Sequence, residues 1–213
     1  MSSSTPLAPW FFRKRFAIFG SVYGVSFMLG FVIAGVFGIP AQPVFLSSSH
    51  PYALATVAVT LAIGGYALRV WASSYIAASI VWTQDVQLEE LRVSGPYRIT
   101  RNPLYLGNLL QAIGIGMLGP WPVTALLIVL MPAYVLVLVS VEERFLAAKN
   151  GAAYSAYRAT VARLIPAPGK VAADGGQRGS LRDGLRSEVL TAGFALAALL
   201  VTLWWLIPQR SAV

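Results

Sequence analysis

The stretch Val93–Gln111, VSGPYRITRNPLYLGNLLQ, joins a polar turn directly to an apolar segment. Three arginines lie close around the turn: Arg92, Arg98 and Arg101. Pro103 suits the first position of a helix, where the N–H that proline lacks has no intrahelical acceptor. The pattern predicts a helix that starts at Pro103, with N–H groups available to a carboxylate or a phosphate.

The composition of the chain is that of an integral membrane protein. Of its 213 residues, 57% are hydrophobic and only 11% are charged, whereas typical soluble domains carry about 25% charged residues. Such a chain has too little polar surface to cover a water-facing exterior. We expect an all-α fold with five transmembrane helices, in the segments Phe16–Ile39, Tyr52–Val81, Leu104–Gly119, Val123–Val141 and Val189–Ile207.

The first apolar segment, Phe16–Ile39, follows the basic residues Arg13, Lys14 and Arg15. A cleaved signal peptide has the same order of charge and apolar sequence, but its apolar region is only about 7–15 residues long. Phe16–Ile39 runs for 24 residues without a charge. We therefore favour a retained membrane helix.

A tight turn joins the third and fourth apolar segments. It contains Gly119-Pro120-Trp121-Pro122, and its two prolines forbid a continuous helix. Glycines in the third segment allow the two helices to approach closely. The two segments rise about 24 Å and 28 Å, so we predict a helical hairpin whose free ends, Arg101–Pro103 and Glu142-Glu143, lie level at one membrane interface.

Two segments connect the fourth apolar segment to the fifth. In Glu142–Pro166, helical spacing relates Tyr154, Tyr157, Arg158 and Val161, which predicts an amphipathic helix on the cytoplasmic membrane surface. Residues 167–184 are rich in Gly, Ala and charge and are typical of a flexible linker. We therefore expect an N-terminal part (1–50), a core (51–166), a linker (167–186) and a C-terminal membrane helix (187–213).

The distribution of charge predicts the orientation. With a cytoplasmic N-terminus and five spans, 14 of the 16 Lys and Arg residues and all eight acids face the cytoplasm, and the C-terminus lies on the opposite side. Arg210 then lies on the non-cytoplasmic side of the membrane. Arg69 lies within the second segment, where it either reaches toward the nearer interface or serves a function. This asymmetry accounts for the net charge of +8 without nucleic acid as a partner.

The external loops contain no ionisable residue except His50, so we expect any chemistry at the cytoplasmic face. The chain has no cysteine, which excludes thiolate metal sites, and its single histidine cannot build a zinc site or a Ser-His-Asp triad. We expect His50 to be a plain loop residue and no metal to be bound. Glu142 and Glu143 leave two interpretations: they end a helix and pair with arginines, or they hold ribose hydroxyls or a cation.

Several motifs then occur in a fixed order over about residues 55–166: Leu68–Trp71, Ser94–Arg98, Arg101–Gly107, Glu142-Glu143, Tyr154 with Tyr157, and Arg163–Pro166. Together they resemble the isoprenylcysteine carboxyl methyltransferase and phospholipid methyltransferase superfamily of membrane enzymes. The resemblance implies methyl transfer from S-adenosylmethionine to a lipophilic acceptor that enters from the bilayer. The cofactor is then held in a pocket that faces the cytoplasm.

The resemblance also implies site residues. An upstream polar contact falls on Gln84 or Gln87. The expected cofactor contacts are Gln87, Glu89, Glu90, Leu91, Arg92, Tyr97, Asn102, Pro103, Leu104, Tyr105, Glu142 and Glu143. The expected catalytic residues are Arg101, Asn102 and Tyr105, and the expected substrate contacts are Arg69, Arg98 and Leu138.

Two departures from the superfamily pattern leave the acceptor open. The carboxyl methyltransferases usually have histidine where this chain has Asn102, and Leu138 stands where they use an arginine for the substrate carboxylate. Arg69, Arg98 or Arg144 are the cations that can replace it. A non-catalytic membrane scaffold or a small transporter is the alternative class, but charges gathered at one interface argue against transport. The sequence does not indicate an oligomeric state.

Overall fold

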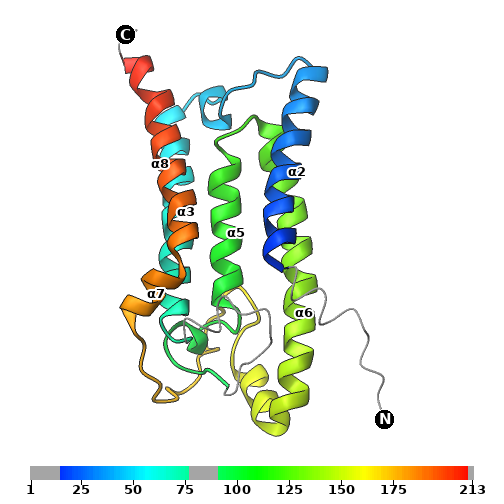
Figure 1. Cartoon of the computed structure of the whole chain (residues 1–213), viewed down its shortest axis with the longest axis vertical. Coiled ribbons are helices and arrows are strands. Elements are labelled where there is room, and N and C mark those ends of the chain that lie inside the picture. The colour runs from blue at the N-terminus through cyan, green and yellow to red at the C-terminus, as the bar shows by residue number, and fades with distance from the viewer. Residues whose placement is uncertain (1–14, 77–90, 211–213) are drawn as a thin grey trace. The chain divides into compact units, whose positions relative to one another are not determined.

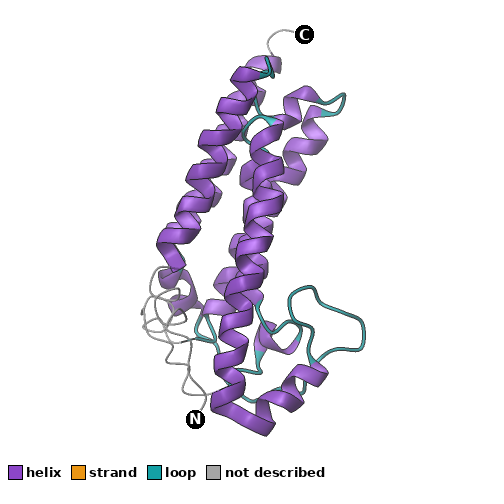
Figure 2. Ribbon diagram, turned by 90° about the vertical axis from the view of Figure 1, so that its right-hand side faces the viewer, coloured by secondary structure: helices purple, strands orange, loops and turns teal. Residues whose placement is uncertain are grey.

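The computed structural model describes residues 15–76 and 91–210. Its regular structure there is helical, with one isolated β-bridge between Thr100 and Ala162 (Figure 2). The helices (Figure 1) are α2 (Arg15–Val36), α3 (Pro51–Ser73), α5 (Pro103–Gly116), α6 (Trp121–Thr160), α7 (Leu181–Ser187) and α8 (Val189–Arg210), with two short 3-10 helices, η1 (Val44–Ser47) and η2 (Gly95–Arg98). The predicted all-α fold is confirmed.

Among the residues that the structure describes, three segments are long and apolar enough to cross a membrane: Ala17–Val36, Pro51–Ser73 and Trp121–Thr160. α5 has only 14 residues, so at 1.5 Å per residue it rises about 21 Å. That rise is shorter than the hydrocarbon core of a bilayer, which is about 30 Å thick. The chain thus has the helices of a membrane protein, while the five predicted spans remain a prediction.

The connection between α5 and α6 begins after Gly116 and contains Gly119 and Pro120. Pro122 already belongs to the first turn of α6, where proline removes no intrahelical hydrogen bond. The Thr124 hydroxyl donates to the Gly116 carbonyl at 2.9 Å and ties the start of α6 to the end of α5.

α6 continues through the glutamate pair. Glu142 and Glu143 lie inside this 40-residue element, so the expectation that they end a helix is wrong, whereas the expected pairing with arginines is found for Glu143. The backbone leaves helical geometry only at Gly151, where φ is 49° and ψ is −120°, a conformation that glycine adopts at little cost. Part of the predicted amphipathic helix, 142–150, therefore extends the apolar helix, and residues 152–160 form a separate piece.

Contacts within the chain define two compact units, which we describe separately. Unit 1 comprises Met1–Phe19, Leu68–Leu106 and Tyr134–Glu188. Unit 2 comprises Gly20–Ala67, Gly107–Ala133 and Val189–Val213. Among the described residues, the buried charged side chains Arg69, Glu143 and Glu188 all belong to unit 1.

In unit 2, glycines bring the backbones of α3 and α5 close together. A Cβ atom on Gly65 would lie 2.5 Å from the carbonyl oxygen of Gly107, and one on Gly114 would lie 2.5 Å from the carbonyl oxygen of Ala58. Small residues allow this approach in membrane helices, where packing replaces the hydrophobic driving force. α8 also contacts α5, because the Gln111 amide donates to the Thr191 carbonyl at 3.4 Å.

The glycine contact predicts a difference between two adjacent substitutions. Gly65→Ala should lower the free energy of unfolding by about 1–3 kcal/mol, because the new methyl group overlaps backbone atoms of α5. Gly64→Ala should be neutral or stabilising, because that position is exposed with open space around it and alanine favours the helix over glycine. Denaturant unfolding in detergent, followed by circular dichroism, measures both; equal stabilities would contradict this packing.

Candidate active site

A cavity in unit 1 gathers residues from the polar turn, from the start of α5 and from α6. It measures about 580 Å³ when the open space at its mouth is counted. Its lining residues are Ile76, Leu91, Arg92, Tyr97, Arg101, Asn102, Pro103, Leu104, Tyr105, Glu142, Leu146, Tyr154 and Tyr157. Segments distant in the sequence therefore meet at one solvent-accessible hollow.

Most of the predicted cofactor residues line this cavity. They are Leu91, Arg92, Tyr97, Asn102, Pro103, Leu104, Tyr105 and Glu142, and the three predicted catalytic residues line it as well. Gln84, Gln87, Glu89 and Glu90 lie outside the described residues. Glu143 is not part of the lining but contacts two residues that are.

Sequence reasoning missed four lining residues: Ile76, Leu146, Tyr154 and Tyr157. Tyr154 and Tyr157 stand three residues apart on the second piece of α6, with ring centroids 6.1 Å apart. Both tyrosines belong to the motifs that carry the family resemblance, and this could have predicted that they line the cavity. Leu146 follows Glu142 by four residues, so helical spacing alone puts the two on one face.

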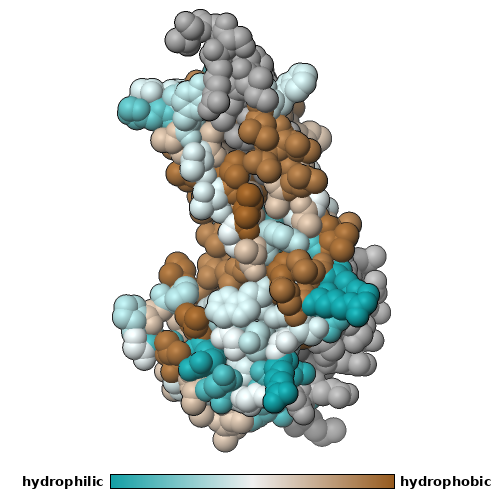
Figure 3. Space-filling view, turned by 90° about the vertical axis from the view of Figure 1, so that its left-hand side faces the viewer, coloured by the Kyte–Doolittle hydropathy of each residue, from teal (hydrophilic) through white to brown (hydrophobic). Residues whose placement is uncertain are grey.

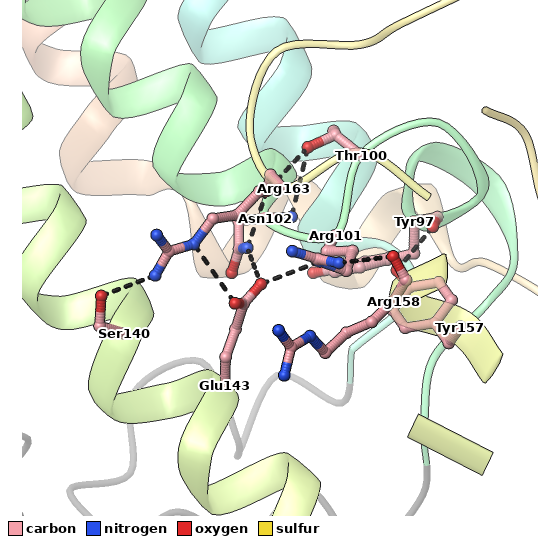
Figure 4. Close-up of polar contacts among 9 residues, drawn as sticks. All are labelled: Tyr97, Thr100, Arg101, Asn102, Ser140, Glu143, Tyr157, Arg158 and Arg163. Carbon is pink, nitrogen blue, oxygen red and sulfur yellow. Dashed lines mark hydrogen bonds and ion pairs between the residues drawn. The ribbon is translucent and has the colours of Figure 1, made fainter. Parts of the chain in front are cut away.

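The Glu143 carboxylate is the centre of a buried polar network (Figure 4). Its Oε1 accepts hydrogen bonds from Arg101 Nε at 2.9 Å and from Asn102 Nδ2 at 3.3 Å. Arg163 Nε lies 3.3 Å from Oε2 in an ion pair, although that contact lacks the geometry of a hydrogen bond. The carboxylate is only 10% exposed, so its charge is balanced by these neighbours rather than by water.

The same network fixes the loop before α5 to the chain that follows α6. Arg101 Nη1 donates to the Arg158 carbonyl at 2.9 Å, and Asn102 Nδ2 donates to the Arg163 carbonyl at 2.8 Å. Arg163 Nη2 donates to Ser140 Oγ at 2.6 Å (Figure 4). Arg101 and Asn102 are therefore held in one arrangement at the cavity wall.

Arg92 Nε and the Tyr154 hydroxyl are buried atoms on lining residues, and neither makes a hydrogen bond with the part of the chain that the structure describes. A buried polar atom without a partner costs about 1–3 kcal/mol, so a polar ligand in the cavity would be stabilised by both. Burial, with a smaller contribution from the charge of Glu142, raises the pKa of Tyr97 well above its ordinary value, and its side chain stays neutral at physiological pH.

The predicted linker holds the segment that carries Leu91 and Arg92. The Gln177 side chain donates to the Leu91 carbonyl and accepts from the Val93 N–H, both at 3.0 Å. The Ser94 hydroxyl donates to Asp174 at 2.6 Å, which lowers the pKa of that carboxyl. Residues 172–177 therefore support one wall of the cavity.

None of the three predicted substrate residues lines the cavity. Arg69 is paired with Glu188, with Nε 2.7 Å from Oε2. Arg98 Nε donates to the Ala172 carbonyl at 3.0 Å, and Leu138 is 2% exposed. Their contact with a substrate remains a prediction.

The helices and the cavity define the class of protein: a membrane protein with a tyrosine-rich cavity that polar and apolar side chains line together. Residues 53–153, a little under half of the chain, match the family model described as phospholipid methyltransferase. This match confirms the resemblance to the membrane methyltransferase superfamily. Comparison with curated proteins and with solved structures gave no match.

The buried network predicts a large stability effect at Glu143. Glu143→Ala leaves the Arg101 guanidinium buried without its carboxylate, and breaking a buried pair in this way costs about 3–5 kcal/mol. Arg144→Ala, at the exposed neighbouring position, should change the free energy of unfolding by less than about 0.5 kcal/mol. Thermal unfolding of both variants in detergent measures the difference, and similar midpoints would show that the network contributes little.

Proposed function

We propose that this chain transfers a methyl group from S-adenosylmethionine to a lipophilic acceptor at the cytoplasmic face of a membrane. The acceptor is the carboxylate of an isoprenylcysteine-like molecule or the amine of a phospholipid. The observation that carries the proposal is that residues of the family-matched segment, from Arg92 to Tyr105 and Glu142, converge on one cavity.

The chemistry of the lining suits this cofactor. S-adenosylmethionine has a carboxylate, an ammonium group, a sulfonium, ribose hydroxyls and an adenine ring. The cavity offers a guanidinium at Arg92, a carboxylate at Glu142 and the rings of Tyr97, Tyr105, Tyr154 and Tyr157. Arg92 Nε and the Tyr154 hydroxyl are buried atoms that a polar ligand would satisfy.

Individual roles follow from charge and position. We expect Arg92 and the first turn of α5 to hold the carboxylate, because a helix start favours negative groups. Glu142 would hold the ammonium group or the ribose. Tyr97 and Tyr105 would place ring faces against the sulfonium or the adenine.

When bound, the cofactor supplies a methyl group that its positive sulfur has already activated. The protein then has to align donor and acceptor and keep water away. Leu91, Leu104 and Leu146 add apolar lining for this purpose. Glu142 is the one acid in the described lining. An amine acceptor must lose a proton before it attacks, so Glu142 would have to accept that proton as well as contact the cofactor.

The orientation is part of the proposal. We propose five spans with the N-terminus and the active site cytoplasmic, and the C-terminus on the opposite side. The support is the position of 14 of the 16 basic residues and the apolar sequence of α8, which has no charged residue from Val189 to Gln209.

Cofactor binding distinguishes this proposal from a scaffold or a transporter. The purified chain in nanodiscs should bind S-adenosylmethionine in calorimetry. Glu142→Ala should weaken binding by about tenfold or more, because hydrogen bonds to charged groups contribute about 1.5–3 kcal/mol. The affinity of Glu142→Gln should lie between those of the parent and of Glu142→Ala, because glutamine keeps the shape of the side chain and loses its charge.

Lys170→Ala is the control, since Lys170 is exposed and is not part of the cavity lining. Equal affinities for Glu142→Ala and the parent would show that the cofactor binds elsewhere. A folded parent that binds no S-adenosylmethionine would contradict the enzyme proposal and favour the non-catalytic alternatives.

A further inference from the structure

α7 presents two kinds of side chain on its exposed side. Leu181 and Leu185 are 65% and 45% exposed, and Arg182 and Arg186 are exposed as well. Residues four apart lie on one face of a helix. α7 therefore carries a row of leucines beside a row of arginines, which together we call the α7 face.

The opposite side of α7 is seated directly on α3. Gly184 is buried, and a Cβ atom there would lie 2.5 Å from the Val70 carbonyl oxygen and 3.0 Å from the Ser74 N–H nitrogen. Ser187, three residues on, is also buried. The view in Figure 1 shows α7 beside the end of α3. The close contact at Gly184 therefore sets which side of α7 faces α3.

Hydrogen bonds clamp both ends of α7. At its start, the Ser180 N–H donates to the Ser74 carbonyl at 2.7 Å. At its end, the fully buried Glu188 accepts from Arg69 Nε at 2.7 Å, from Arg69 Nη2 at 2.9 Å and from the Ser73 hydroxyl at 2.6 Å. Because these bonds hold both ends of α7 against the end of α3, the α7 face has a fixed direction relative to it.

The cations of this segment are not neutralised within the described chain. Arg178, Arg182 and Arg186 make no ion pair with an acid among residues 15–76 and 91–210. Asp183 is the one acid between Gly175 and Ser187, and it lies in the first turn of α7, where it complements the helix dipole. The α7 face is therefore complementary to a surface that is both apolar and negatively charged.

A bilayer interface that contains anionic lipids has both properties. Apolar side chains enter the boundary between headgroups and acyl chains, and basic side chains bind the phosphates. The sequence directly after Glu188 is apolar, and Val189 and Leu190 are exposed. Figure 3 shows one face of the molecule, on which hydrophobic and hydrophilic residues lie next to one another.

We propose that α7 is an interfacial anchor that binds anionic phospholipid. Leu181 and Leu185 enter the interface, and Arg178, Arg182 and Arg186 contact lipid phosphates. The clamp by Arg69, Ser73 and Glu188 holds α7 in the orientation that this requires. The anchor does not depend on the methyl-transfer proposal, because it needs only the chain in a membrane.

Lipid titration followed by native mass spectrometry tests the arginines. The full chain in detergent should bind phosphatidylglycerol more tightly than phosphatidylcholine. Arg182→Gln should weaken phosphatidylglycerol binding about 5-fold, and the double variant Arg182→Gln, Arg186→Gln about 30-fold, because each basic residue near an anionic surface contributes about 1 kcal/mol. Lys149→Gln with Lys170→Gln, an equal loss of charge at exposed positions elsewhere, should keep the parent affinity.

A parent without preference for phosphatidylglycerol would overturn the proposal, as would equal losses in the double variant and the control. The leucines are tested separately by labelling Leu185→Cys with a fluorophore, since the chain has no other cysteine. In vesicles of phosphatidylcholine and phosphatidylglycerol, nitroxide-bearing lipids should quench the label and aqueous iodide should not. The reverse pattern would show that the α7 face lies in water.

Discussion

The carboxylate of Glu143 ties together the parts of unit 1 that form the cavity. It accepts from Arg101 and Asn102 before α5 and pairs with Arg163 after α6. Charges this buried are costly unless they are paired, and the partners leave few alternative arrangements. The loop before α5, the middle of α6 and the chain after Thr160 are thereby fixed with respect to one another. Side chains of the first two, together with the start of α5, make up most of the cavity lining.

The two adjacent glutamates are separated by geometry into two roles. Consecutive residues on a helix point about 100° apart. Glu143 therefore reaches the arginine network while Glu142 lines the cavity. Because the helix continues through both of them to Gly151, Leu146 reaches the same cavity from the next turn.

Local rules predicted much of this structure. The preference of proline for the first position of a helix predicted that α5 starts at Pro103. The order of the motifs predicted most of the residues that line the cavity. Contacts between residues far apart in sequence could not be predicted: Arg69 and Glu188 stand 119 positions apart, and Glu188 lies at the start of the part predicted as the C-terminal membrane helix, 187–213. The break at Gly151 could not be predicted, because a single glycine in the sequence is compatible with both a kink and a continuous helix. The end of the apolar helix was predicted at Val141, because hydropathy falls at Glu142, whereas the helix continues past that residue.

We propose that the cavity serves methyl transfer to a lipid. The most direct measurement incubates the purified chain, in vesicles, with S-adenosylmethionine labelled in its methyl group and with farnesyl- or geranylgeranyl-cysteine analogues, phosphatidylethanolamine or simple thiols. The account predicts label in the organic extract for a prenylcysteine or phospholipid acceptor. Label in no acceptor, from folded protein that binds the cofactor, would contradict it.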